Sequence, residues 1–368
     1  MGTDRLVFIR TDGNSQIATG HLMRCLSIAD ACVTLGMQVC FLVSDSESEE
    51  LLNGFLSSFA FTKSLSVTKV PGGNYQDLSA ELPHLFSLLT HILAEKDCTI
   101  CNAVFFLDSY YVTPEYLDAL KGRIKIAYLD DLQLFDYPVD LLINYDVIPD
   151  ACMPSYLDAY QKAGKALLGG AYTPLRSQFQ NRKGMLRDTV SDILITTGGS
   201  DPFHFCLKLI QAIKANSFLV SNPILLHVVI GRLNTDRDKL YELAEKLSFL
   251  HLHENVSNMA SLMETCDLAV SASGTTLYEL CALGIPAISF TMADNQLPSA
   301  EAFAKAGAVP CAGDLRHNDS IVIQDVIDFV TYMSQNISKR KSAHETMSRL
   351  IDGNGSKRIA EAIFQLSC

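Results

Sequence analysis

One histidine of this sequence stands where proton-transfer chemistry is easiest to support. His21 follows Gly20 and opens a stretch, residues 22–35, with apolar residues at helical spacing. The partial positive charge of a helix N-terminus disfavours imidazolium, so we expect a neutral imidazole that acts as a general base on a water or a hydroxyl. The plainer interpretation is a histidine that caps its helix or packs against it.

Charged and polar residues accompany this histidine at the ends of two expected strands. Arg10 and Asp12 precede it, and Arg24 follows one helical turn later. Another apolar run ends in Asp108 and Tyr110, a carboxylate and a phenol that can hold sugar hydroxyls. We assign all five to the substrate sugar site. A surface position for Arg24 and plain turn chemistry for Asp108 are the alternatives.

A glycine turn follows a strand later in the chain. Gly198, Gly199 and Ser200 come before Pro202, which suits the first turn of a helix. Glycine permits close backbone approach, and free N–H groups at a helix start bind phosphate. Neither a Walker loop nor the GxGxxG fingerprint of dinucleotide sites is present. We assign Gly199 and Ser200 to nucleotide binding.

A second phosphate-binding turn is the most informative one. Ser273, Gly274 and Thr275 end a strand and start a helix, which places backbone N–H groups and hydroxyls at its N-terminus. Glu279 lies about one turn further on and can accept hydrogen bonds from both ribose hydroxyls. A capping box formed by Thr275 or Thr276 with Glu279 is an alternative that is compatible with this role.

Two carboxamides follow the next strand. Asn295 and Gln296 stand in the segment Ala-Asp-Asn-Gln, residues 293–296, and we assign them to the substituted sugar. The alternative is a plain helix N-cap in the same segment.

These loops need elements that bring them together. Short apolar runs alternate with helical patterns, and the alternation restarts at a strand over 192–197, after a stretch rich in Gly and Arg at 168–188. Such strands predict parallel sheets covered on both faces, with ligands at the carboxyl ends of the strands. We therefore expect an α/β protein with two Rossmann-like domains facing across a cleft. Residues 1–180 would carry the catalytic loop and residues 181–368 would bind the nucleotide.

The composition bounds the class of protein. The chain has 368 residues, of which 48% are hydrophobic and 19% charged, which excludes wholesale disorder. The net charge of −12 argues against a nucleic-acid partner or an anionic membrane surface. Residues 1–180 carry 12 basic and 21 acidic side chains, whereas the remainder carries 17 and 20. The less acidic half is the one expected to hold phosphate.

The cysteines and the N-terminus indicate a compartment. The 11 cysteines lie mostly in apolar runs, and the one CxxC pattern, Cys98 to Cys101, lacks the second ligand pair of a metal site. Free thiols in a reducing cytosol are expected. The first residues lack the order of a signal peptide, and no run of 18 apolar residues is present. We expect a cytoplasmic protein without a membrane span or a bound metal; the sequence does not define the oligomeric state.

Taken in order, the loop motifs resemble one family. Residues 20–26, Gly-His-Leu-Met-Arg-Cys-Leu, are similar to the N-terminal motif of the UDP-2,4-diacetamido-2,4,6-trideoxy-β-L-altropyranose hydrolases of pseudaminic acid biosynthesis. The likeness spans the chain to about residue 313. It continues through residues 107–110, 129–132, 168–172, 175–176, 198–202, 273–279 and 293–296.

The resemblance implies a GT-B fold, similar to that of the glycosyltransferase that makes lipid II. It also implies hydrolysis of a UDP-sugar by C–O cleavage at the anomeric carbon, without metal or cofactor. His21 matches the catalytic histidine that positions or deprotonates the water, and Tyr110 and Asn295 match sugar-site positions. The positions that correspond to the nucleotide site are Ser273, Gly274, Thr275 and Glu279, with the backbone near Val256 contacting uracil. We place Gly20 with this nucleotide-binding group.

One departure and three alternatives accompany this prediction. Ala18 stands where the family usually has glycine, which predicts a stiffer loop and leaves the sugar open. A GT-B glycosyltransferase that uses a UDP-sugar donor is the main alternative function. A 2-epimerase and a non-catalytic nucleotide-sugar sensor are the others.

Overall fold

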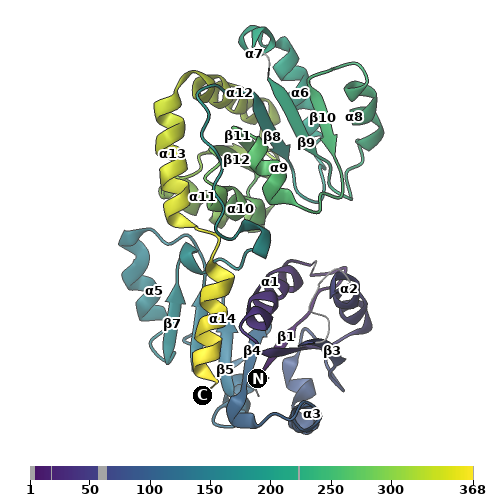
Figure 1. Cartoon of the computed structure of the whole chain (residues 1–368), viewed down its shortest axis with the longest axis vertical. Coiled ribbons are helices and arrows are strands. Elements are labelled where there is room, and N and C mark those ends of the chain that lie inside the picture. The colour runs from purple at the N-terminus through teal and green to yellow at the C-terminus, as the bar shows by residue number, and fades with distance from the viewer. Residues whose placement is uncertain (1–4, 18, 57–63, 223, 368) are drawn as a thin grey trace. The chain divides into compact units, whose positions relative to one another are not determined.

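The computed structural model describes residues 5–17, 19–56, 64–222 and 224–367 (Figure 1). Ala18, the departure noted above, lies outside these residues. The chain forms two compact units. Unit 1 comprises Met1–Asp146, Asp150–Ser177 and Asn354–Cys368, and unit 2 comprises Val147–Pro149 and Gln178–Gly353.

Unit 1 is built on a seven-stranded parallel sheet. The strands are β1 (Leu6–Thr11), β2 (Gln38–Val43), β3 (Leu65–Lys69), β4 (Ala103–Asp108), β5 (Lys125–Leu129), β6 (Leu141–Asn144) and β7 (Lys165–Leu168). Their spatial order is β3-β2-β1-β4-β5-β6-β7, and every neighbouring pair is parallel. The order reverses between β1 and β4, and ligands of such sheets bind outside the carboxyl ends of the strands at that point.

Helices cover both faces of this sheet. They are α1 (Gly20–Thr34), α2 (Ser46–Leu56), α3 (Leu82–Glu95), α4 (Pro114–Leu120), α5 (Met153–Ala159) and α14 (Gly355–Leu366), with a short 3-10 helix η2 (Leu78–Glu81). In β1, Val7 and Ile9 belong to one core, whereas Leu6 and Phe8 belong to the other. Successive strand residues point to opposite faces, so the continuous apolar run reflects burial on both sides.

Unit 2 repeats the same winding on six parallel strands. They are β8 (Asp192–Thr196), β9 (Leu225–Val229), β10 (Leu250–His253), β11 (Leu268–Ala272), β12 (Ala287–Thr291) and β13 (Cys311–Asp314), in the order β10-β9-β8-β11-β12-β13. The helices are α6 (Phe205–Ala215), α7 (Ser217–Ser221), α8 (Arg237–Ala244), α9 (Met259–Thr265), α10 (Thr275–Leu283), α11 (Leu297–Lys305), α12 (Asp319–Gln335) and α13 (Ile337–Leu350), with the 3-10 helix η7 (Asp294–Gln296). The order reverses between β8 and β11. The predicted two-domain α/β architecture with parallel sheets is confirmed.

The expected ranges 1–180 and 181–368 differ from these units at the C-terminus. Helix α14 belongs to unit 1, where Ile359 and Ile363 share the core of α1. A Cβ on Gly355 would lie 2.1 Å from the Thr173 carbonyl oxygen, so glycine permits a close backbone approach there. The Ser356 hydroxyl donates to the Leu175 carbonyl at 2.8 Å. The sequence offered a single linker, whereas the chain passes between the units again near Gly353.

Among the described residues, no helix combines the length and the apolar character needed to cross a bilayer.

Candidate functional site

The geometry centres on a pair formed by a histidine and a carboxylate at the point where the order of the unit 1 strands reverses. His21 is the second residue of α1, and Asp108 is the last residue of β4. The imidazole Nδ1 lies 2.6 Å from Asp108 Oδ1. Both side chains are buried, with relative exposures of 6% and 1%. The two sequence motifs that contain His21 and Asp108 therefore contribute to one site.

The charge state of Asp108 fixes the role of each imidazole nitrogen. Burial raises the pKa of this carboxyl group, but the guanidinium of Arg24 and the contact with His21 outweigh it, so the pKa lies well below its usual range. An ionised carboxylate only accepts hydrogen bonds, so the contact with Asp108 requires a proton on Nδ1, which also lies 3.0 Å from Arg24 Nη2. In the neutral imidazole the opposite nitrogen, Nε2, carries the lone pair, which is the arrangement of a general base.

Arg24 does not contact the pocket; it holds the carboxylates around it. Its Nε and Nη2 donate to the two oxygens of Asp108 at 2.6 Å and 2.5 Å. Its Nη1 donates to Asp131 Oδ2 at 2.6 Å and to the Tyr145 hydroxyl at 2.8 Å. Arg24 was expected to contact the sugar. In the structure every nitrogen of its guanidinium already has a protein partner.

Tyr110 packs against the imidazole. Its ring meets that of His21 edge to face, with centroids 4.4 Å apart, and its hydroxyl donates to Asp131 Oδ2 at 3.2 Å. Burial and the charge of Asp131 raise the pKa of Tyr110 to about 12, so the phenol keeps its proton and acts as a donor.

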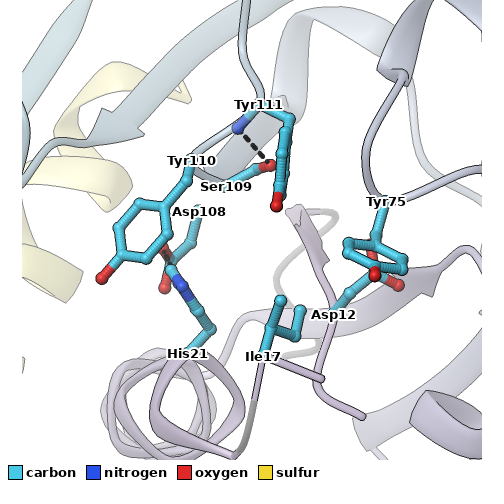
Figure 2. A pocket seen from close by; sticks show the side chains of 8 residues that line it. All are labelled: Asp12, Ile17, His21, Tyr75, Asp108, Ser109, Tyr110 and Tyr111. Carbon is cyan, nitrogen blue, oxygen red and sulfur yellow. Dashed lines mark hydrogen bonds and ion pairs between the residues drawn. The ribbon is translucent and has the colours of Figure 1, made fainter. Parts of the chain in front are cut away.

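A pocket of about 250 Å³ opens beside this pair. Figure 2 shows His21 and Tyr110 together on one side of the pocket, and Tyr75 across from them near Asp12. The lining residues are Asp12, Ile17, His21, Tyr75, Asp108, Ser109, Tyr110 and Tyr111. Of the predicted sugar residues in unit 1, the structure brings Asp12, Asp108 and Tyr110 to this pocket.

Arg10 and Asp12 occupy different depths. Arg10 is fully buried, and its Nε donates to both oxygens of Glu81, at 3.1 Å and 2.9 Å. It also forms an ion pair with Asp12, whose other oxygen accepts from the backbone N–H and the hydroxyl of Ser44. The structure therefore places Arg10 beneath the pocket, where it supports Asp12, and not in the pocket wall.

The glycine turn of unit 2 differs from the expected phosphate cradle in one respect. Helix α6 begins at Phe205 and not beside Pro202, because the Asp201 carboxylate accepts hydrogen bonds from the backbone N–H groups of Phe205 and Cys206 at 2.8 Å and 2.9 Å. This helix end is thus already capped by a negative charge. Gly199 is exposed and Ser200 half-buried in the turn that precedes the cap.

The turn after β11 keeps its helix end open. Helix α10 has Gly274 as its N-cap, no side chain caps it, and the space where a Cβ of Gly274 would lie is empty. The Ser273 hydroxyl donates to the Phe290 carbonyl at 3.0 Å, so it supports the turn. Thr275 is exposed in the first turn of α10, and Glu279 is half-buried in the second. The N-cap of this helix is Gly274 and not Thr275.

Three of the remaining predicted positions, Val256, Asn295 and Gln296, belong to unit 2, whereas Gly20 belongs to unit 1. Val256 is half-buried in the loop after β10, next to Asn255, whose φ is 48°. Asn295 is exposed in η7, and the Gln296 side chain accepts from the Met292 backbone N–H at 2.8 Å. Gly20 is exposed at the start of α1 with open space above it.

Sequence reasoning missed several members of the site. Asp131 and Tyr145 follow β5 and β6 and share the Arg24 guanidinium, while Tyr75 and Tyr111 line the pocket with rings 5.8 Å apart. Asp131 is the second residue after β5, and that position near a strand end was the signal. No cluster of His, Cys, Asp and Glu within the described ranges is arranged to hold a metal ion.

Known proteins with a similar sequence or structure identify the fold class of this chain. Residues 193–360 match the family model "Glycosyltransferase family 28 C-terminal domain". The solved structure of MurG from Acinetobacter baumannii superimposes with a TM-score of 0.66 at 16% identity, over 98% of this chain and 99% of that one. Arabidopsis thaliana UGT89C1 complexed with UDP gives a TM-score of 0.61 at 11% identity, over 99% and 100%. The fold is thus the GT-B fold of glycosyltransferases.

Two curated proteins resemble the sequence itself. The spore coat polysaccharide biosynthesis protein SpsG of Bacillus subtilis is 27% identical over 199 residues, which cover 54% of this chain and 57% of that protein. The uncharacterized protein MJ1062 of Methanocaldococcus jannaschii is 23% identical over 290 residues, which cover 77% and 54%. The chain spans just over half the length of each relative.

Proposed function

We propose that the protein transfers a glycosyl group from a nucleotide-sugar donor to an acceptor hydroxyl, with His21 as the general base. The observation that carries the proposal is the buried His21–Asp108 pair at the point where the unit 1 strand order reverses, within a GT-B fold. The family model match over most of unit 2 supports a nucleotide-sugar donor.

The reaction follows from the tautomer. Asp108 keeps the proton on Nδ1, so Nε2 accepts the proton of the attacking hydroxyl as its oxygen forms a bond to the anomeric carbon. The bond from that carbon to the diphosphate oxygen breaks, and the nucleoside diphosphate leaves with the electron pair. Attack from the face opposite the leaving group inverts the anomeric configuration.

Unit 2 supplies the charge stabilisation that the leaving group needs. The uncapped N-terminus of α10, with Gly274 and Thr275, presents backbone N–H groups where a diphosphate can bind. In this proposal Glu279 accepts hydrogen bonds from the ribose hydroxyls, and the backbone near Val256 contacts the base. The UDP complex of UGT89C1, a protein of the same fold, supports a uridine nucleotide.

Hydrolysis is the second candidate, with water in place of the acceptor hydroxyl. The motifs at residues 20–26 and 107–110, which resemble those of UDP-sugar hydrolases and which provide His21 and Asp108, favour this candidate. Under this candidate the donor is the UDP-linked diacetamido-trideoxy-hexose that the motif resemblance implies, and the product serves pseudaminic acid or a related surface glycan.

The test separates the two by product. The protein is incubated with a panel of nucleotide sugars, with and without sugar acceptors, and phosphorus NMR follows release of the diphosphate. Release that needs an acceptor supports transfer, and release in water alone supports hydrolysis. Tight binding without release under both conditions contradicts both candidates and indicates a sensor.

The first prediction concerns His21. His21→Asn keeps a polar side chain of similar size but removes the base, so turnover should fall by about 10²–10⁴-fold while UDP affinity is retained. His91→Asn is the matched control, since His91 is an exposed histidine of α3 in the same unit. Calorimetry with UDP and steady-state kinetics check both variants. Loss of UDP binding in His21→Asn would reassign His21 to a structural role.

A further inference from the structure

We infer that Arg24 is a positioning residue that keeps the His21–Asp108 pair singly protonated and holds the imidazole from two sides. The inference rests on the proposed function for its kinetic test, but not for its spectroscopic one. Arg24 lies one turn after His21 on α1, and only 11% of its side chain is exposed. Because it does not line the pocket, it acts through its partners.

The first arm runs through Asp108. The planar guanidinium binds this carboxylate side-on through Nε and Nη2, at 2.6 Å and 2.5 Å, which sets the plane in which Oδ1 faces His21 Nδ1. Such a two-bond arrangement fixes orientation as well as distance, and a lysine cannot reproduce it.

The second arm runs through Asp131 to the face of the imidazole. Arg24 Nη1 donates to Asp131 Oδ2 at 2.6 Å, and the same oxygen accepts from the Tyr110 hydroxyl at 3.2 Å. The Tyr110 ring then meets the imidazole edge to face. One guanidinium therefore fixes both the hydrogen bond at Nδ1 and the aromatic contact with the ring of His21, which lines the pocket beside Tyr110 (Figure 2).

The charge balance explains why a cation is needed here. Asp108 is almost fully buried, and Arg24 is the guanidinium that compensates it. Without that cation, the carboxylate and the imidazole would take up one further proton, on Asp108 or on Nε2, at a higher pH than they do beside Arg24. Either site ends general-base function, because the first removes the acceptor for Nδ1–H and the second occupies the lone pair. The other titratable groups that face the pair are Asp12, Cys25, Tyr110, Asp131 and Tyr145.

The kinetic test compares charge and shape at one position. Arg24→Gln removes the charge and should move the acidic limb of the kcat profile to higher pH by about 1 to 3 units. Arg24→Lys keeps the charge but loses the fork, so kcat should fall while the acidic limb stays close to that of the wild type. Donor KM should change little in either variant. Arg123→Gln, an exposed arginine before β5, is the control for the same charge change.

The spectroscopic test needs no turnover. Nitrogen NMR of the whole protein labelled at histidine reports the protonation of each imidazole nitrogen, and the spectrum of His21→Asn identifies the His21 signals among those of nine histidines. The wild type should show Nδ1 protonated and Nε2 free at neutral pH. Arg24→Gln should show the pair taking up its further proton at a higher pH than the wild type. Thermal unfolding verifies that each variant is folded.

Two results would overturn the inference. One is an Arg24→Gln protein whose His21 signals and acidic limb match the wild type. The other is a raised donor KM with an unchanged pH profile in both Arg24 variants, which would make Arg24 a sugar contact. If the protein turns over no nucleotide sugar, the proposed function fails, while the NMR result still decides the role of Arg24.

Discussion

At the scale of single residues, the carboxyl groups near the strand ends of unit 1 lie in different environments, which shift their pKa values differently. Asp108 is ionised because Arg24 and His21 outweigh its burial. Asp146 is the second residue after β6, and its carboxylate accepts from the Tyr156 hydroxyl at 3.1 Å. Burial first, and then the charge of Asp131, raise the pKa of Asp146 to about 6. The pKa values of two aspartates at the same edge of one sheet are therefore shifted in opposite directions.

Asp146 gives a pH-dependent prediction for stability. Its folded pKa of about 6 exceeds the unfolded value of roughly 3.9, so the folded state binds the proton more tightly. Stability from this group is present at acidic pH, falls as the pH rises from about 4 to about 6, and stays low above. Asp146→Asn should raise the free energy of unfolding at pH ~7.5 by about 3 kcal/mol, since each unit of the pKa difference is worth about 1.4 kcal/mol, and have no effect at pH ~4. Urea unfolding at both pH values measures this, and an equal effect at both would contradict it.

At the scale of elements, two glycine-containing loops of unit 2 that are similar in sequence lead into helices whose N-termini differ in capping. The turn after β8 leads into a helix whose first N–H groups are taken by Asp201. The turn after β11 leads into α10, whose N-cap, Gly274, carries no side chain and has open space above it. An anionic ligand can use the second helix end at no cost in protein hydrogen bonds.

Gly274 tests that helix end directly. Its φ is −113°, which alanine adopts, and no atom would obstruct a Cβ. Gly274→Ala should therefore leave the free energy of unfolding within about 0.5 kcal/mol, and yet weaken UDP binding by roughly tenfold or more, because the methyl group occupies the space of the diphosphate. Calorimetry measures the affinity. Gly54→Ala in α2 of unit 1, where a Cβ also meets nothing, is the matched control. Unchanged UDP affinity in Gly274→Ala would exclude this helix end as the phosphate site.

What the sequence could predict follows from periodicity. Apolar runs separated by helical patterns gave the parallel sheets, and the position of His21 and Asp108 after strands placed them at one sheet edge. The contacts among side chains could not be predicted, since they depend on rotamers and on strand order. That order puts β4 beside β1, so Asp108 reaches His21 across 87 positions of sequence. The same applies to Arg24, which sequence spacing placed in the sugar site and the fold placed behind it.

At the scale of the whole molecule, the last helix belongs with the first. Helix α14 buries Ile359, Ala360 and Ile363 in the core that also contains α1. These residues carry no motif, but they recur at helical spacing, which is the signal that predicts an amphipathic helix. Helical spacing alone could not show that the apolar face of α14 packs in unit 1, so the predicted domain range 181–368 included this helix.

Ile363 tests the dependence of unit 1 on its C-terminal helix. Ile363→Ala should lower the free energy of unfolding of unit 1 by about 2–5 kcal/mol, because it leaves a cavity between α14 and α1. The unfolding transition of unit 2 should stay where it is. Differential scanning calorimetry with and without UDP assigns the two transitions, and Gln365→Ala, an exposed position of the same helix, is the control. Equal displacement of both transitions would show that the units unfold together.

The return of the chain at Gly353 also sets an order for synthesis. Unit 2 takes nearly all its residues from one continuous stretch, Gln178–Gly353, whereas unit 1 needs Asn354 and the residues after it to cover the apolar face of α1. A ribosome releases those residues after all of unit 2. Unit 2 can therefore complete its core on the nascent chain, while unit 1, although it begins first, keeps one side of its core open until α14 has left the ribosome. The unit that carries His21 is thus completed by a helix made after the other unit.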